Sequence, residues 1–269
     1  MPEALGGRLQ VDFLCVACNS RLGHDVDAFV KRDPAIGLAI HAFAAAHPEQ
    51  GVALLEGLDV MAHSQGGVSS AKIIKGEARI RSERLADGSL IQPTRTARKS
   101  VETMLLRQGT QPGPLEEALR KFDSAPPDRP VEVAPGLVVT NWTVTKVEPD
   151  LSGAVLDPLL PLKIAFEFLA LHFGAAIYQP LPPLVAIRDS LQGGQLHESI
   201  SITSLRANRD DPIHGILLEG NDPHARVQIR LFGRLAYRVH FRTIAVGGKR
   251  FAYTHDLATD DEAVTEALE

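Results

Sequence analysis

Alternation of apolar and polar positions predicts a β layer in the C-terminal half of the chain. From Val227 to Ile244, apolar side chains occupy mainly the odd positions, and arginine recurs at even positions every fourth residue, a pattern typical of strands with one buried face. We expect this run to bend near Gly233 and to join strands at Ile200–Ile202 and Gly215–Leu218. The acidic tail from Asp256 to Glu269 is expected to fray.

Other segments follow helical spacing. The segment from Leu159 to Phe173 is apolar on nearly every side, so we expect a helix buried at the centre of the core. Strands are expected at Val52–Leu58 and at Ala71–Arg84, the second closed by a turn at Ala86–Ser89. Further helices are predicted at 17–31, 35–47, 95–107 and 115–122.

These elements together predict an α+β fold, an antiparallel sheet with surrounding helices. A chain of 269 residues with 44% hydrophobic content is long enough to bury a substantial core. The proline-rich stretch at 124–130 is a possible internal linker.

Composition narrows the class of protein. The net charge of −5 provides no global basic field, so nucleic-acid binding would require a local basic surface. We find no apolar run of about 18 residues and no secretory signal, which predicts a protein without a membrane partner. Two cysteines do not form a disulfide framework, so we expect a reducing, cytoplasmic compartment.

Cys15 and Cys18 form a Cys-x-x-Cys pair at a strand-to-helix junction. Two thiolates there can supply half of a tetrahedral zinc site. A redox pair and two inert thiols are the alternatives, although the context of a thioredoxin-like motif is missing.

The residues around this pair resemble a family of HNH endonucleases with a zinc-bound ββα-metal finger. The resemblance is carried by Pro2–Gly7, Leu14–Gly23, Val26-Asp27 and Asp33-Pro34. In that family, a first Cys-x-x-Cys and a Glu-His-x-x-Pro segment lead directly into the Ala-Leu-Gly-Gly loop. Pro2 matches the proline, so the catalytic histidine is expected upstream of Met1, and we expect an N-terminally truncated finger.

The resemblance implies metal-dependent hydrolysis of nucleic acid phosphodiester bonds, with the missing histidine as general base. It implies Cys15 and Cys18 as a structural Zn²⁺ half-site and Asn19 as a ligand of catalytic Mg²⁺ or another divalent cation. Asn19 is alternatively a helix cap. Hydrolysis is expected to be impaired in this chain, either because the gene starts upstream or because this copy has decayed.

Arg230, Arg234 and Arg238 are the candidate nucleic-acid-binding residues. On strands they would share one face with Arg226 and Arg242, and a basic face can neutralise phosphates without reading base sequence. A solvated sheet face is the alternative. DNA is the favoured partner.

Ser64 carries a rival hypothesis. His63-Ser64-Gln65-Gly66 resembles the nucleophile elbow of α/β-hydrolases, with Ala62 replacing the first glycine, but no repeated βα pattern follows.

The sequence therefore predicts a partial HNH finger at 1–34 and an α+β domain at 35–269. The predicted function is that of an HNH endonuclease homologue. A non-catalytic nucleic-acid-binding or structural protein is the first alternative, and a serine hydrolase is the second.

Overall fold

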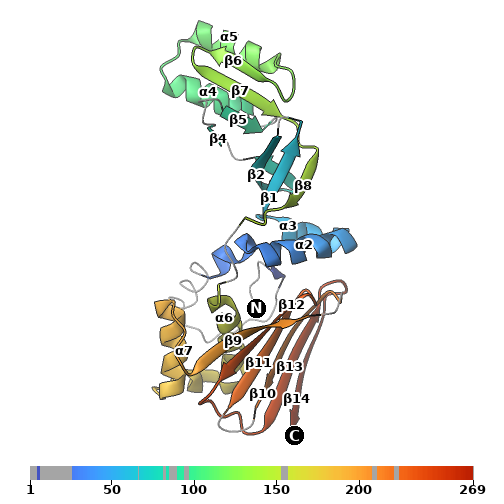
Figure 1. Ribbon diagram of the computed structural model, residues 1–269, viewed down its shortest axis with the longest axis vertical. Helices are drawn as coiled ribbons and strands as arrows, with labels where there is room; N and C mark the ends of the chain where they lie inside the picture. The colour runs from blue at the N-terminus through green and yellow to red at the C-terminus, as the bar shows by residue number, and fades with distance from the viewer. Residues whose placement is uncertain are drawn as a thin grey trace. The chain divides into compact units, whose positions relative to one another are not determined.

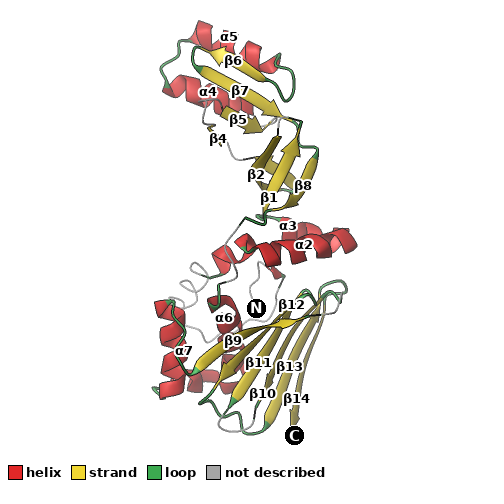
Figure 2. Ribbon diagram, in the orientation of Figure 1, coloured by secondary structure: helices red, strands yellow, loops and turns green. Residues whose placement is uncertain are grey.

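Helices and strands occur in comparable amounts, which confirms the predicted α+β class (Figure 2). None of the helices described in the computed structural model is long and apolar enough to cross a membrane. The structure describes residues 5–6, 26–65, 67–80, 83–84, 90–93, 97–152, 157–207, 211–220 and 224–268.

The chain divides into two compact units. The first contains Met1–Leu55 and Leu151–Glu269, and the second contains Glu56–Asp150. The second unit is therefore inserted into the sequence of the first. The predicted division into 1–34 and 35–269 stays a prediction, and the stretch proposed as a linker, 124–130, joins two elements inside the second unit.

A six-stranded antiparallel sheet dominates the first unit, in the order β14-β13-β10-β11-β12-β9 (Figure 1). The expected bend near Gly233 is a hairpin turn, in which Phe232 and Gly233 both have left-handed φ angles, 54° and 66°. The strands are β9 (Ile200–Arg206), β10 (Ile213–Glu219), β11 (Ala225–Leu231), β12 (Leu235–Phe241), β13 (Lys249–Asp256) and β14 (Asp261–Leu268).

One face of this sheet is buried against α6 (Leu159–Phe173), which packs on β10, β11 and β12. Buried side chains of these strands include Ile216, Val227 and Val239. They alternate with polar residues because successive side chains of a strand point to opposite faces. The predicted central core helix is therefore confirmed, and η3 (Gly174–Tyr178) and α7 (Pro182–Gly193) pack beside it.

The N-terminal helices are fixed by their first residues and by close packing. Asp33 caps α2 (Pro34–Ala46), where its carboxylate accepts hydrogen bonds from the backbone of Ala35 at 2.8 Å and Ile36 at 3.0 Å, as expected for an N-cap residue. Gly51 of α3 lies so close to α2 that a Cβ there would be 2.4 Å from the Ala44 Cα. A short 3₁₀ helix, η2 (Asp27–Arg32), precedes α2.

The prediction of a strand at Val52–Leu58 was wrong, because Pro48–Leu55 forms α3. A short apolar run does not separate helix from strand by its period alone. Here Pro48 suits a first helical position, and Gly51 allows close packing on α2.

The prediction of a frayed C-terminus was also wrong, because Asp261–Leu268 forms β14. Its acidic residues find partners on β13: Lys249 Nζ lies 3.1 Å from Glu266 Oε1, and the Tyr253 hydroxyl donates to Glu262 Oε1 at 3.4 Å.

Two four-stranded sheets form the framework of the second unit, in the orders β3-β2-β1-β8 and β4-β5-β7-β6. The helices α4 (Ala97–Arg107) and α5 (Pro112–Asp123), both predicted, share a core with β6 and β7. The strands are β1 (Asp59–Ser64), β2 (Gly67–Ile74), β3 (Glu77–Ile80), β4 (Glu83–Arg84), β5 (Leu90–Pro93), β6 (Pro130–Ala134), β7 (Leu137–Trp142) and β8 (Lys146–Pro149).

The predicted single strand at Ala71–Arg84 is instead divided among β2, β3 and β4. The chain reverses between β2 and β3 at Lys75 and Gly76, whose φ angles are 54° and 74°. A lysine in the left-handed region is uncommon, so only the glycine signalled this turn in the sequence.

Candidate nucleic-acid interface

The predicted metal ligands Cys15, Cys18 and Asn19 lie outside the residues that the structure describes. Among the described residues, no group of three or more His, Cys, Asp or Glu side chains could hold a metal ion. The Zn²⁺ and divalent-cation sites therefore stay predictions.

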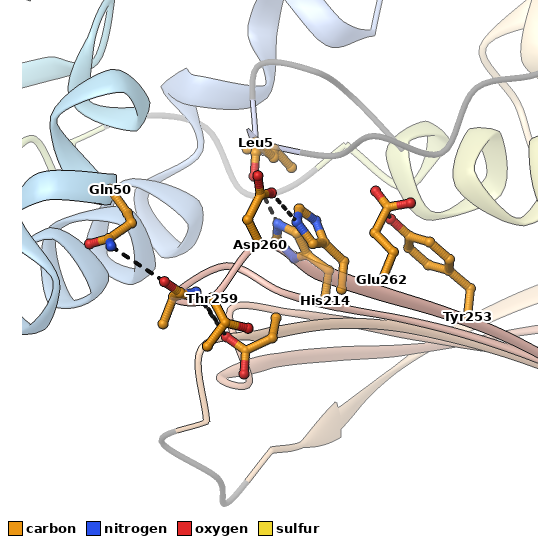
Figure 3. Close-up of polar contacts among 10 residues, drawn as sticks. Leu5, Gln50, His214, Tyr253, Thr259, Asp260 and Glu262 are labelled. Carbon is orange, nitrogen blue, oxygen red and sulfur yellow. Dashed lines mark hydrogen bonds and ion pairs between the residues drawn. The ribbon is translucent and has the colours of Figure 1, made fainter.

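Leu5, from the Ala-Leu-Gly-Gly loop of the predicted finger, is anchored in the first unit. Its side chain is fully buried, and its carbonyl oxygen accepts a hydrogen bond from His214 Nε2 on β10 at 2.8 Å (Figure 3). Gly6 follows with a φ of 78°, and a Cβ there would lie 3.1 Å from the Leu54 side chain. Leu5 and Gly6 are therefore part of the compact unit that contains the six-stranded sheet.

His214 has partners for both ring nitrogens. Nε2 donates to Leu5, while Nδ1 accepts from the backbone N–H of Phe232 at 3.3 Å, which defines a neutral tautomer. Burial lowers the pKa of His214 to about 4, because the charged form would lose its hydration. This histidine is a structural residue of the core.

His255, opposite His214 on β13, is also buried. Its Nε2 lies 3.0 Å from Asp260 Oδ1 in the turn before β14 (Figure 3). The same turn is held by Gln50 of α3, whose side-chain amide donates to the Ala258 carbonyl at 3.3 Å. These contacts tie the N-terminal helices to the C-terminal hairpin.

The opposite face of the sheet carries the arginines. On β11, Arg226 and Arg230 are separated by Gln228 on the same face, and Gln228 pairs with Arg238 on β12. At a rise of about 3.3 Å per residue, Arg226 and Arg230 lie about 13 Å apart along the strand. We define the arginine face by Ser201, Thr203, Glu219, Arg226, Gln228, Arg230, Arg238 and His240, which the strand register places on one side of β9–β12.

Arg226, Arg230 and Arg238 have no ion pair with a carboxylate in the part of the chain that the structure describes. Glu219 lies opposite Arg226 in the register. Its carboxylate instead accepts from the Gln228 side chain at 3.3 Å and lies 3.9 Å from Arg250 Nε. No described carboxylate therefore neutralises the three arginines by direct contact.

Two buried nitrogens on β12 also lack hydrogen-bond partners among the described residues. They are Arg238 Nε and His240 Nε2, and the two side chains are neighbours on the same face. A buried polar group without a partner costs about 1–3 kcal/mol.

Burial and nearby positive charges shift the pKa of His240. Burial lowers its pKa, and the positive charges of Arg226, His224, Arg242 and Arg238 lower it further. His224 lies beside it, with the two ring centroids 5.6 Å apart. A negatively charged ligand would oppose these effects and favour the charged imidazole.

The prediction that all the arginines share one sheet face holds for Arg226, Arg230 and Arg238, but not for Arg234 and Arg242. Arg234 lies in the turn between β11 and β12, and Arg242 follows the end of β12. A four-residue spacing continues through a hairpin turn in the sequence, whereas the alternation of faces holds only within each strand. Arg234 is exposed at the end of the hairpin.

Ser64 does not lie on a strand-to-helix turn. It ends β1 and pairs with Gly67, the first residue of the antiparallel strand β2. A nucleophile elbow requires a helix after the serine, so this geometry does not support the serine hydrolase hypothesis.

No family model, curated protein or solved structure matches this chain. Functional inference therefore depends on the residues themselves. His240 and Gln228 belong to the arginine face but were missed in the sequence. Their signal was present, because both occupy even positions in an alternation whose odd positions are apolar.

Proposed function

We propose that this protein binds the sugar-phosphate backbone of nucleic acid through the arginine face. The observation that carries the proposal is the group of Arg226, Arg230 and Arg238 on two neighbouring strands, none of which has a carboxylate partner among the described residues. Arginine donates to phosphate oxygens in a fixed fork geometry, and such hydrogen bonds are stronger than those between neutral groups.

The spread of these arginines favours a polyanion over a single small anion. One phosphate cannot contact Arg226 and Arg230 together easily when they are about 13 Å apart along the strand. A backbone with regularly spaced phosphates can contact each in turn. Gln228 and Thr203 flank Arg238 in the register and offer further polar contacts. Contacts of this kind position a nucleic acid but do not read its bases.

A solvated sheet face is the competing interpretation, because antiparallel sheets commonly expose one polar side to water. It accounts for the alternation of polar residues. The salt dependence of DNA binding distinguishes the two interpretations.

The resemblance of residues 1–34 to HNH endonucleases extends the proposal to metal-dependent phosphodiester hydrolysis, with DNA as the favoured substrate. The resemblance alone carries this extension. Leu5, which belongs to the matched segment, contacts His214 on the face of the sheet opposite the arginines. In this proposal the arginine face holds a strand for hydrolysis by the finger.

Two assays test these parts separately. Fluorescence anisotropy with labelled duplex DNA in EDTA should show binding that weakens as salt rises, because arginine–phosphate contacts require no metal and release counterions. Salt-independent binding, or none, would reject the arginine face. Plasmid nicking that requires Mg²⁺ or Mn²⁺ would support the endonuclease part of the proposal. If the plasmid stays intact while the protein binds DNA, the protein is a non-catalytic nucleic-acid-binding protein.

A further inference from the structure

An apolar pocket of about 420 Å³ lies in the first unit between α6, η3, α7 and the segment that follows β12. Its volume falls within the range of about 300–1,000 Å³ that is usual for small-molecule sites. The arginines described above lie on the other face of the sheet. Residues lining the pocket include Leu169, Phe173, Ala176, Ile177, Leu184 and Ile244.

Among the described residues, no charged side chain lines this pocket. Arg188 of α7 lies near η3, but its Nη1 donates to the Ile177 carbonyl at 2.6 Å, and the guanidinium also reaches the Gln179 carbonyl at 3.4 Å. This guanidinium is thus engaged by the backbone of the pocket wall. A carboxylate or phosphate ligand would therefore find no counter-charge on the pocket wall.

The first turn of α7 offers no free donor either. Pro182 and Pro183 have no backbone N–H, and the N–H groups of Leu184 and Val185 both donate to the Leu181 carbonyl, at 3.0 and 2.9 Å. The usual attraction of a helix N-terminus for anions is therefore weak here.

Apolar surface continues to the mouth of the pocket, where the Leu181 and Phe173 side chains are 50% and 36% exposed. Gln179 and Thr243 are the two lining residues with polar side chains. A few placed polar groups in an apolar wall orient a ligand.

We propose that this pocket binds an uncharged, largely apolar small molecule that presents one or two hydrogen-bonding groups to Gln179 and Thr243. The proposal is independent of nucleic-acid binding. Its basis is the volume of the pocket, the absence of charge from the described part of its wall, and the two proline positions that remove backbone donors from the rim.

N-phenyl-1-naphthylamine is a suitable probe because it is neutral, apolar and fluorescent in apolar surroundings. We expect saturable binding of one probe per chain. Ala176→Trp and Ala245→Trp each fill the pocket from an exposed position and should weaken binding roughly tenfold or more without unfolding the protein. Ala45→Trp, at an exposed position of α2 outside the pocket, is the matched control and should bind like the wild type.

Circular dichroism and thermal melts of all three variants confirm that any loss of binding is local. Unchanged probe binding in both Ala176→Trp and Ala245→Trp would overturn the proposal, as would the absence of saturable binding to the wild type. A second copy of the chain is the alternative occupant of the pocket, and sedimentation velocity tests it. A dimer that dissociates when the probe is added would mean that a second copy covers the pocket, and would also overturn the proposal. A double variant with Gln179→Leu and Thr243→Val should still bind this nearly apolar probe. It should no longer bind hydroxylated derivatives of the probe more tightly than the probe itself.

Discussion

His214 and His240 lie on opposite faces of the same six-stranded sheet, and they differ in their hydrogen-bond partners and in the charges around them. Both have a lowered pKa, and burial is the largest cause for each. His214 has partners for both ring nitrogens, whereas His240 Nε2 has none among the described residues. His240 is also surrounded by arginines, while His214 is enclosed by the core.

The two ring partners of His214 mark it as a structural histidine, whereas the arginines around His240 make it a candidate for contact with an anion. A buried polar group with all its hydrogen bonds made stabilises one arrangement of the chain. A buried polar group without partners, next to unneutralised charge, costs free energy until a ligand satisfies it. The pKa direction alone would not have distinguished the two.

The largest expected effect concerns His214. Its pKa falls from 6.5 to about 4 on folding, so its contribution to stability is complete above pH 6.5 and is lost as the pH falls towards 4. A pKa difference of about 2.5 corresponds to about 3 kcal/mol of unfolding free energy. Urea unfolding of the wild type across this range should show the loss.

His214→Leu removes the titrating group, so the free energy of unfolding should vary less with pH between 6.5 and about 4. The substitution also leaves the Leu5 carbonyl without its donor, which should lower stability at neutral pH. His197→Gln changes an exposed histidine and should leave the profile unchanged. If His214→Leu shows the same acid dependence as the wild type, His214 is not the group responsible.

Arg238 should contribute more to DNA affinity than Arg234. Arg238 lies on the sheet face between Gln228 and Thr203, whereas Arg234 lies in the hairpin turn. Arg238→Gln should weaken binding by roughly tenfold at low salt, and Arg234→Gln by about threefold or less. Equal losses in anisotropy titrations would show that net charge matters rather than the arginine face.

The smallest expected effect is a pH dependence of binding. Burial and neighbouring cations lower the pKa of free His240, and a bound phosphate should raise it, so binding takes up a proton. DNA affinity should therefore increase several-fold as the pH falls from about 7.5 to about 5.5. His240→Gln should reduce this increase, while His197→Gln should not; an identical increase in both variants would exclude His240.

Much of the fold was predictable from the sequence, but turns and short elements were not. The helix at Leu159–Phe173 and the strand alternation around Gly233 were found because long periodic segments constrain their own structure. The helix Pro48–Leu55 was missed because its packing on α2 decides it, and strand β14 was missed because its pairing with β13 decides it. Neither contact can be read from the local sequence.

The candidate site was only partly predictable, for the same reason. The alternation of apolar and polar positions identified the arginines. The pairing of β11 with β12 decides which of them share a face: Arg234 lies in the turn and is excluded, whereas Gln228 and His240 lie on the arginine face. The unsatisfied Arg238 Nε depends on tertiary burial, which no sequence pattern expresses.

A salt titration of DNA binding by two matched double variants tests the central claim most directly. Arg230→Gln with Arg238→Gln removes two charges from the arginine face, and Arg120→Gln with Arg129→Gln removes two exposed charges from the second unit. We expect the slope of log affinity against log salt to decrease in magnitude by about 2 in the first variant and to stay at the wild-type value in the second. Equal slopes in the wild type and both variants would contradict the assignment of phosphate binding to this face.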